Sequence, residues 1–216
     1  MFGAPAFAAA VDFTGNAALT AAYVYRRISQ TQGDPTAQTG FKAAFTNGIY
    51  GSIWGSGVHF RGKTGASAEV DYVAGWNRAL GDKWALDMNV TYFNYPSARV
   101  ALAYPELIGT VTSAQKYWLM LWYSPDVFAT GASGIYTEIG AKLPISDAVR
   151  LEIAIGRYDL DAAYGKSYAH ARLGAVWAFS KPFKLRVTAH DTDGGGKVLF
   201  PGQAGSRLEA AIQASF

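Results

Sequence analysis

Residues 206–216, the C-terminal segment, alternate between apolar and mostly polar side chains. A period of two is that of a β-strand with one apolar face. The apolar positions are Leu208, Ala210, Ile212, Ala214 and Phe216. A strand ending on an exposed Phe is unusual in water, where termini fray, but it suits a closed sheet whose outer face meets lipid. The segment is therefore predicted to be the closing strand of a transmembrane β-barrel.

The composition leaves two classes of fold open. The chain is 50% hydrophobic and 16% charged, yet its longest apolar cluster, residues 117–123, is too short for a membrane-spanning helix. Such a chain is either a soluble β protein with a large core or a membrane barrel. The net charge of +3 is small and the basic residues form no run, so nothing points to nucleic acid.

Turn residues divide the chain into short segments that we expect to be about twelve strands of a single antiparallel up-and-down barrel. Tight turns, such as Thr46-Asn47-Gly48 and Leu80-Gly81-Asp82, alternate with longer polar connections. With twelve strands both termini fall on the short-turn side, as in outer-membrane barrels. Residues 99–115 leave ten strands open as an alternative. The predicted strands are 18–30, 36–46, 49–60, 67–79, 83–95, 100–111, 115–124, 134–143, 148–159, 167–180, 183–191 and 206–216.

Several of these strands show one apolar and one polar face. In residues 149–156, for example, Leu151, Ile153 and Ile155 alternate with Glu152 and Ala154. A soluble sandwich would show the same alternation with its apolar face in the core. Aromatic residues crowd the strand ends, as in the girdles at the two interfaces of a bilayer, and glycines are frequent on the polar face, so the membrane barrel is favoured.

The N-terminal segment, residues 1–12, is predicted to be the remainder of a secretion signal or a disordered leader. It contains two small-x-small cleavage candidates, Ala6-Phe7-Ala8 and Ala8-Ala9-Ala10. The predicted barrel domain is then residues 13–216.

The first predicted hairpin carries a family resemblance. Residues 23–31, read with Gly33-Asp34-Pro35 and Gln38, resemble the Y-V-F-R-G-I-S-Q-T-x-G-x-P-x-x-Q hairpin of the TorF-type porin family. Residues 49–58 resemble the Y-A-G-V-W-A-S-N-V strand of that family, and residues 69–75 its E-x-D-Y-x-x-G strand. Arg27 replaces a usual Gly of the pattern. The resemblance implies an outer-membrane channel and names no solute.

The C-terminal pattern of Leu208 to Phe216 also resembles the signal that the insertion machinery of bacterial outer-membrane proteins reads. The expected surroundings are therefore outer-membrane lipid, lipopolysaccharide, that machinery and a small polar solute. The sequence does not indicate the oligomeric state.

If the apolar positions point outward, the charges lie inside the barrel. The predicted basic wall is Arg26, Arg150, Arg172, Lys184, Arg186 and Arg207. The predicted acidic wall is Glu69, Asp71, Asp87 and Glu106. In a ring of twelve strands the two walls face each other, which gives a transverse field that favours polar solutes, with a mild anion preference.

Two functions remain open from the sequence: a narrow pore, and a structural or assembly barrel closed by charge pairs such as Glu138 with Lys142 and Arg150 with Glu152. No catalytic, metal or cofactor site is predicted, because the three histidines fall on separate strands without metal-ligand spacing. The glycine-rich residues 193–197 are expected to form a flexible external loop.

Overall fold

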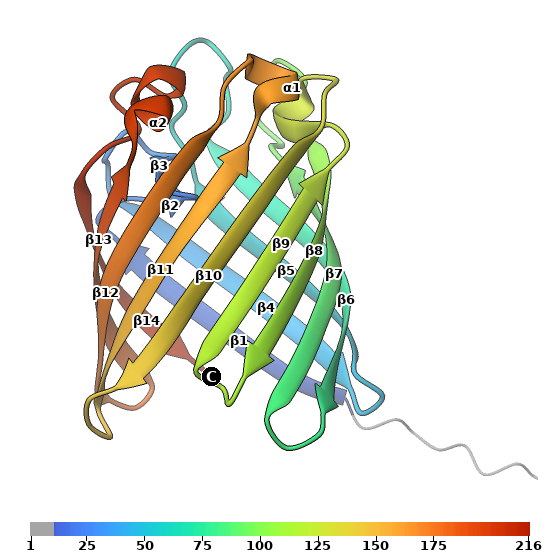
Figure 1. Cartoon of the computed structure of the whole chain (residues 1–216), viewed down its shortest axis with the longest axis vertical. Helices are drawn as coiled ribbons and strands as arrows, with labels where there is room; N and C mark the ends of the chain where they lie inside the picture. Colours follow the sequence, from blue (N-terminus) through green and yellow to red (C-terminus); the bar gives the residue numbers. More distant parts are fainter. Residues whose placement is uncertain (1–10) are drawn as a thin grey trace, which may run out of the picture.

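A computed structural model describes residues 11–216, which form a closed barrel of 12 antiparallel strands (Figure 1). The barrel strands are β1 (Val11–Thr20), β4 (Thr36–Phe45), β5 (Ile49–Gly57), β6 (Ala68–Leu80), β7 (Trp84–Asn94), β8 (Tyr104–Ser113), β9 (Tyr117–Ser124), β10 (Gly134–Pro144), β11 (Val149–Asp159), β12 (Tyr168–Ser180), β13 (Phe183–Thr192) and β14 (Arg207–Ser215). Strands β2 (Val24–Tyr25) and β3 (Ile28–Ser29) form a separate small sheet. The predicted all-β up-and-down barrel is confirmed.

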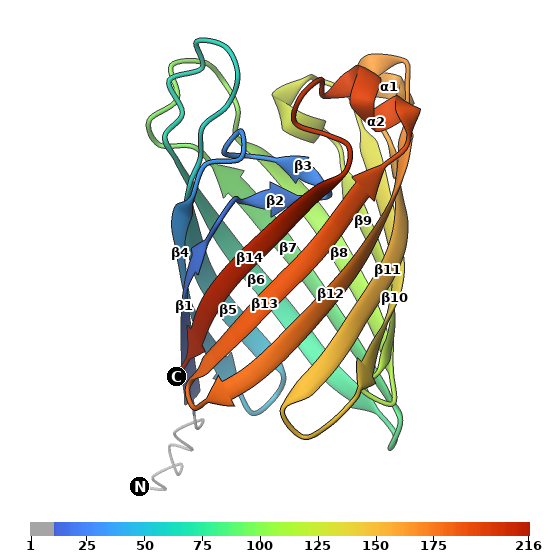
Figure 2. The same cartoon turned by 90° about the vertical axis from the view of Figure 1, so that its left-hand side faces the viewer.

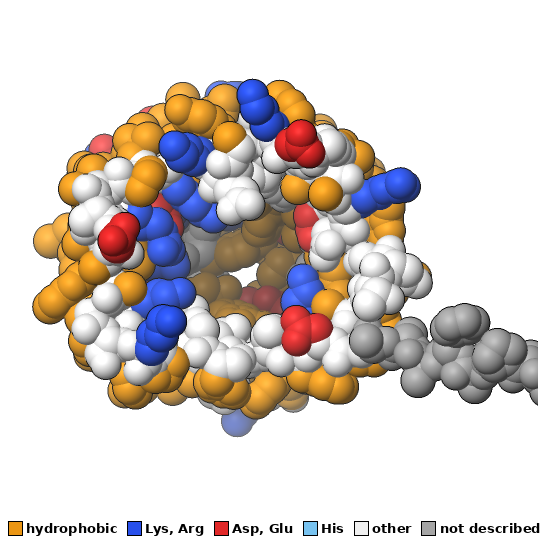
Figure 3. Space-filling model, turned by 90° about the horizontal axis from the view of Figure 1, so that it is seen from below, with side chains coloured by type: hydrophobic (Ala, Val, Ile, Leu, Met, Phe, Trp, Pro, Cys, Tyr) orange, Lys and Arg blue, Asp and Glu red, His pale blue; other side chains and the backbone are white. Residues whose placement is uncertain are grey.

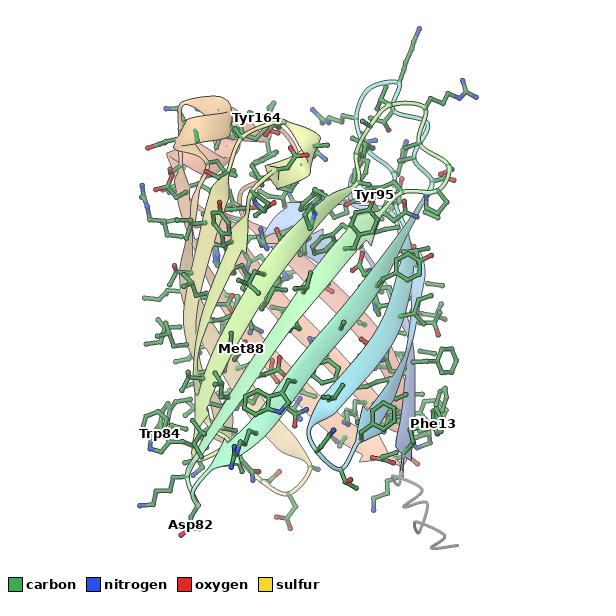
Figure 4. The ribbon with its side chains drawn as sticks, turned by 90° about the vertical axis from the view of Figure 1, so that its right-hand side faces the viewer. Phe13, Asp82, Trp84, Met88, Tyr95 and Tyr164 are labelled. Atoms are coloured by element: carbon green, nitrogen blue, oxygen red, sulfur yellow. The ribbon has the colours of Figure 1, made fainter. Side chains whose placement is uncertain are left out.

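The apolar face of the strands points out of the barrel. In β11, Ile153 and Ile155 are exposed, whereas Glu152 and Ala154, which alternate with them, are buried. Figure 4 shows Phe13 and Trp84 pointing away from the wall near the short-turn end, and the exposed fraction of Phe13 is 76%. An outer surface this apolar is that of a barrel in lipid, and it rules out the soluble sandwich.

The barrel closes where β1 meets β14. Their registered pairing runs from Asn16 opposite Ser215 to Thr20 opposite Ala211, and it is shorter than the β1–β4 pairing, which runs the full length of β1. The backbone of Phe216 exchanges two hydrogen bonds with that of Gly15, with N–O distances of 2.6 and 3.0 Å. Closure leaves the sheet with no free edge, which a backbone in lipid requires.

Short turns and long connections lie at opposite ends of the barrel, as predicted. The connection between β8 and β9 is one of the short turns, with Ala114 and Gln115 at φ angles of 49° and 56°. Both β8 and β9 are strands of the barrel wall, so the ten-strand alternative is wrong.

The helices lie in the long connections. They are the 3₁₀ helix η1 (Val127–Ala129), α1 (Asp161–Tyr164) and α2 (Gly194–Leu199). No helix among residues 11–216 is long and apolar enough to cross a membrane. Helix α2 replaces the flexible loop expected at residues 193–197, because the Asp193 side chain accepts a hydrogen bond from the Gly196 N–H at 3.1 Å and caps the helix.

The first predicted strand, residues 18–30, is wrong. The first strand of the barrel is β1, which ends at Thr20, and residues 21–35 leave the wall and fold into the barrel (Figure 2). The segment contains Tyr, Val and Ile residues that favour strands, but Arg26 and Arg27 have φ angles of 45° and 70°, as in the two-residue turn of a tight hairpin. Strands β2 and β3 therefore pair only with each other. We call residues 21–35 the inserted hairpin.

Strand β1 begins at Val11, so Val11 and Asp12 of the predicted leader form part of the barrel wall. The rest of the predicted leader, residues 1–10, lies outside the described residues.

Candidate functional site: a lumen crossed by an inserted hairpin

The root of the inserted hairpin is held on the side of β5 and β6. The Tyr23 hydroxyl donates a hydrogen bond to Glu69 at 2.9 Å, and the Tyr23 ring packs edge-on against Trp54, with ring centroids 5.3 Å apart. The backbone N–H of Gln30 donates to Tyr23 O at 2.8 Å, and the N–H of His59 donates to Gln30 O at 2.7 Å. Hydrogen bonds therefore connect the two arms of the hairpin to each other and the hairpin to the connection that follows β5.

The tip of the hairpin reaches the far wall through Arg26. Its guanidinium forms an ion pair with Glu106 of β8, and the two side chains are 3% and 1% exposed. Four aromatic rings surround the guanidinium carbon, with centroids 4.0–4.7 Å away; they belong to Tyr25, Trp122, Tyr136 and Tyr158. Cation–π contacts in a site without water are stronger than exposed ones, so this cage fixes the tip.

The next residue, Arg27, enters a network of charges. Its guanidinium lies 2.7 Å from Glu138 of β10 and 3.3 Å from His190 Nδ1. Glu138 also accepts hydrogen bonds from Trp118 at 3.2 Å and Tyr136 at 2.9 Å. A shared carboxylate of this kind satisfies several buried donors at once.

The hairpin consequently crosses the lumen. It leaves the wall between β1 and β4 and contacts β9 and β10, which lie opposite in the ring of strands. The backbone of the hairpin is held as well, because the Tyr168 hydroxyl of β12 donates to Arg26 O at 2.8 Å and the Ser29 N–H donates to Gln203 O, in the connection before β14, at 2.9 Å. Any solute passing through the barrel must pass this hairpin.

The structure places the residues of the predicted basic wall in two groups. Arg150 and Arg172 converge on Glu152, at 2.9 and 3.3 Å. Lys184, Arg186 and Arg207 are half-buried and form no ion pair within residues 11–216. The sequence predicted Arg26 to lie on a barrel strand. The structure instead places it at the tip of the hairpin, because the chain turns there.

The predicted acidic residues do not share one environment. Glu106 is paired with Arg26, and Glu69 accepts the hydrogen bond from Tyr23. Asp71 is buried beside Glu69 on β6, while Asp87 lies farther along the wall and accepts a hydrogen bond from the Tyr50 hydroxyl at 2.9 Å. Two of the four are thus used to hold the hairpin.

Sequence reasoning missed Arg27 and Glu209. Glu209 of β14 lies 2.9 Å from His190 Nε2 and accepts a hydrogen bond from Thr20 at 3.3 Å. Glu138 pairs with Arg27 and Arg172 rather than with Lys142, whereas the expected pair of Arg150 with Glu152 is present. A signal for Arg27 existed, because it stands where the resembling family has Gly and its φ of 70° is one that favours Gly.

The C-terminal residues predicted as an insertion signal lie in β14 and just beyond it. Leu208, Ile212 and Phe216 are exposed on the outer face, and the Phe216 ring contacts Phe41 edge-on at 6.3 Å. Their reading as a signal stays a prediction.

Seen from the short-turn end, the barrel contains a hollow (Figure 3), and Lys and Arg side chains gather along one side of its opening. Among residues 11–216, no group of three or more His, Cys, Asp or Glu side chains is arranged to hold a metal ion.

A second space lies at the end with the long connections. It is a cavity of about 290 Å³ that we call the aromatic chamber. Each of the six long connections, or the strand end beside it, contributes to its lining, and the inserted hairpin contributes Tyr25, Arg26, Ile28 and Gln30. Figure 4 shows Tyr95, at the end of β7, and Tyr164, in α1, at this end of the barrel. Burial raises the pKa of both phenols, so they stay protonated at neutral pH.

The chain matches, over residues 5–215, the family described as "Bacterial protein of unknown function (Gcw_chp)". It belongs to this family. The TorF-type name suggested by the hairpin motif is not confirmed by this match. No curated protein matches the chain by sequence.

Solved outer-membrane barrels share its fold. The KdgM porin is 10% identical with a TM-score of 0.59, covering 94% of this chain and 99% of its own. The NanC porin is 11% identical with a TM-score of 0.55, covering 95% and 99%. The COG4313 outer membrane channel from Pseudomonas putida F1 is 9% identical with a TM-score of 0.50, covering 100% of both chains. The protein therefore has the architecture of an outer-membrane β-barrel.

Proposed function

We propose that the protein is an outer-membrane channel through which small hydrophilic solutes or ions diffuse passively, with the inserted hairpin as its constriction. The observation that carries this proposal is that hollow space adjoins the hairpin on both sides. The lumen opens at the short-turn end (Figure 3), and the aromatic chamber lies at the other end. The fold shared with KdgM, NanC and the COG4313 channel supports it, as does the resemblance to TorF-type porins.

We further propose that the charges along the lumen set its selectivity. Glu69, Asp71 and Asp87 lie on β6 and β7, while the unpaired Arg186 and Arg207 lie across the ring on β13 and β14. Opposed charges across a narrow lumen orient polar solutes. The basic residues without carboxylate partners give a mild preference for anions.

In the same proposal, lipid and lipopolysaccharide cover the apolar outer surface, and insertion machinery reads the outward residues of β14. A strand face of this kind, with Leu208 and Ile212 exposed, fits an apolar environment.

One alternative has a specific observation in its favour. The pairs of Arg26 with Glu106 and of Arg27 with Glu138 are buried at the hairpin tip, as expected of a plug. The protein would then be a non-conducting structural or assembly barrel.

Conductance of the purified barrel in planar bilayers separates the two functions. A channel gives discrete current steps that grow with salt concentration, and measurements under a salt gradient give its ion preference. A barrel that folds, judged by heat-modifiable gel migration, and shows no steps above background contradicts the channel proposal and favours the plug.

A further inference from the structure

The lining of the aromatic chamber combines aromatic rings and positive charges with a few aliphatic and neutral polar side chains. Aromatic rings dominate it: Tyr25, Phe60, Tyr95, Tyr104, Phe128, Tyr158, Tyr164, Tyr168 and Phe200. The charged members are Arg26 and Arg61, and the lining contains no Asp or Glu. Its volume of about 290 Å³ lies at the small end of the roughly 300–1,000 Å³ of ligand pockets, which suits a single ring and its substituent.

The rings are arranged as aromatic groups prefer to meet. Phe128 lies at the centre of this arrangement, with ring centroids 5.4 Å from Tyr104, 5.8 Å from Tyr158 and 6.4 Å from Phe200, all edge-on. An additional flat ring extends such an edge-to-face array favourably.

The chamber also contains buried polar groups without partners. Nε and Nη1 of Arg26 and the hydroxyls of Tyr104 and Tyr158 have no hydrogen-bond partner within residues 11–216. These residues are 5%, 1% and 1% exposed, and all three line the chamber. Glu106 occupies only Nη2 of Arg26, so the guanidinium retains donors for an incoming acceptor.

Arg61 also lines the chamber. It belongs to the connection between β5 and β6, and its guanidinium lies against Gly202 in the connection before β14. A positive charge therefore stands where two connections meet, and a second lies at the hairpin. Both favour an anion over a cation.

The apolar members of the lining decide between two classes of anion. Phe60, Leu102 and Phe200 offer no hydrogen bonds, so those hydroxyls of an acidic sugar that face these three side chains would lose water without replacement. An aromatic ring loses few hydrogen bonds to water when it packs against these side chains. Only the carboxylate of an aromatic acid then needs hydrogen-bond donors.

We propose that the aromatic chamber is a binding site for a small aromatic carboxylate of about the size of benzoate. The binding site itself does not depend on the proposed channel function. Only the step that makes the bound compound the solute carried by the channel rests on that function. The ring would lie among the aromatic side chains of the connections, with the carboxylate toward an arginine.

The test measures binding to the detergent-solubilised full chain by equilibrium dialysis with radiolabelled benzoate. Acetate, benzyl alcohol and glucuronate serve as competitors that lack the ring, the charge and the apolar ring face, respectively. We expect saturable benzoate binding that none of the three displaces at matched concentration. Arg61→Ala should weaken binding by about tenfold, the effect of one charge-assisted hydrogen bond. Phe60→Leu should weaken it less.

Arg99→Ala is the matched control, because Arg99 lies in the neighbouring connection and does not line the chamber. If Arg61→Ala and Arg99→Ala weakened benzoate binding equally, the effect would be one of general charge attraction, and the proposed site would be wrong. Glucuronate binding as tightly as benzoate, or no saturable benzoate binding to a folded barrel, would also overturn it. A barrel that conducts but does not bind benzoate would support the channel function and contradict the binding site. A barrel that binds benzoate but does not conduct would support the binding site and contradict the channel function.

Discussion

The inserted hairpin separates two spaces that differ in chemistry. On one side lies the aromatic chamber, and on the other the charged lumen toward the short turns. Adjacent residues show the difference: Arg26 is caged by rings with a single carboxylate partner, whereas Arg27 joins a network of Glu138 and His190. Two identical side chains, adjacent in the chain, thus have different roles. Arg26 anchors the hairpin, and Arg27 belongs to the ionic lining.

Removing the hairpin is expected to have the largest effect. Because Thr20 and Thr36 are directly paired, a Gly-Ser-Gly link can replace residues 21–35 without stretching the wall. Conductance should rise by about two- to fivefold, since the constriction is gone. Shortening the connection between β7 and β8 by residues 97–100, which do not line the aromatic chamber, should leave conductance near the wild-type value. Equal conductance in the hairpin variant would mean that the narrowest point lies elsewhere.

The role of Arg26 is tested by breaking and then removing its pair. Arg26→Leu leaves Glu106 buried without its cation, which costs about 3–5 kcal/mol and should displace the tip. Single-channel recordings should then show larger and noisier currents. Arg26→Leu combined with Glu106→Leu should restore quiet currents, because no uncompensated charge remains. A double variant as noisy as the single one would assign the anchoring to the aromatic cage alone.

Arg27→Ala should have a smaller effect on the position of the hairpin. Glu138 keeps Arg172, Trp118 and Tyr136 as partners, so the network loses one member rather than its only cation. We expect nearly wild-type current noise and a modest loss of anion preference in reversal-potential measurements. Noise as large as that of Arg26→Leu would remove the distinction between the two arginines.

The smallest expected change is one of selectivity alone. Arg186→Glu combined with Arg207→Glu reverses two lumen charges and should move the reversal potential toward cations at nearly constant conductance. Lys83→Glu combined with Lys181→Glu, in the turns between β6 and β7 and between β12 and β13, is the charge-matched control and should leave selectivity unchanged. Unchanged selectivity in the double variant would contradict the basic-wall assignment.

Much of the barrel could be predicted because lipid-facing strands impose a period of two. Ile153 and Ile155 carry that pattern visibly, and turns such as Thr46-Asn47-Gly48 mark the strand ends. The strand number followed only as far as twelve or ten, since short turns and long connections must alternate between the two ends and residues 99–115 could be read as one loop or as two strands.

The hairpin was not predictable in the same way. Tyr23 to Ile28 are rich in Tyr, Val and Ile, which favour a strand in the wall and a strand of an interior hairpin alike. The interior hairpin differs from a wall strand in the positive φ angles of Arg26 and Arg27. Two consecutive arginines do not predict such angles. The partner of Arg26, Glu106, is 80 residues away in the chain, so the pair depends on tertiary packing. The same holds for Arg61 and its place beside Gly202.

The seam between β1 and β14 adjoins the root of the hairpin. The Thr20 hydroxyl donates to Glu209, and the Ala21 N–H donates to Ala210 O at 2.7 Å, so the last bonds of the seam are the first of the hairpin. Displacement of the hairpin therefore pulls on the junction between β1 and β14, which closes the barrel. In the proposed channel, the width of the pore and the integrity of the wall are thus coupled, and a change that loosens the junction will also loosen the hairpin.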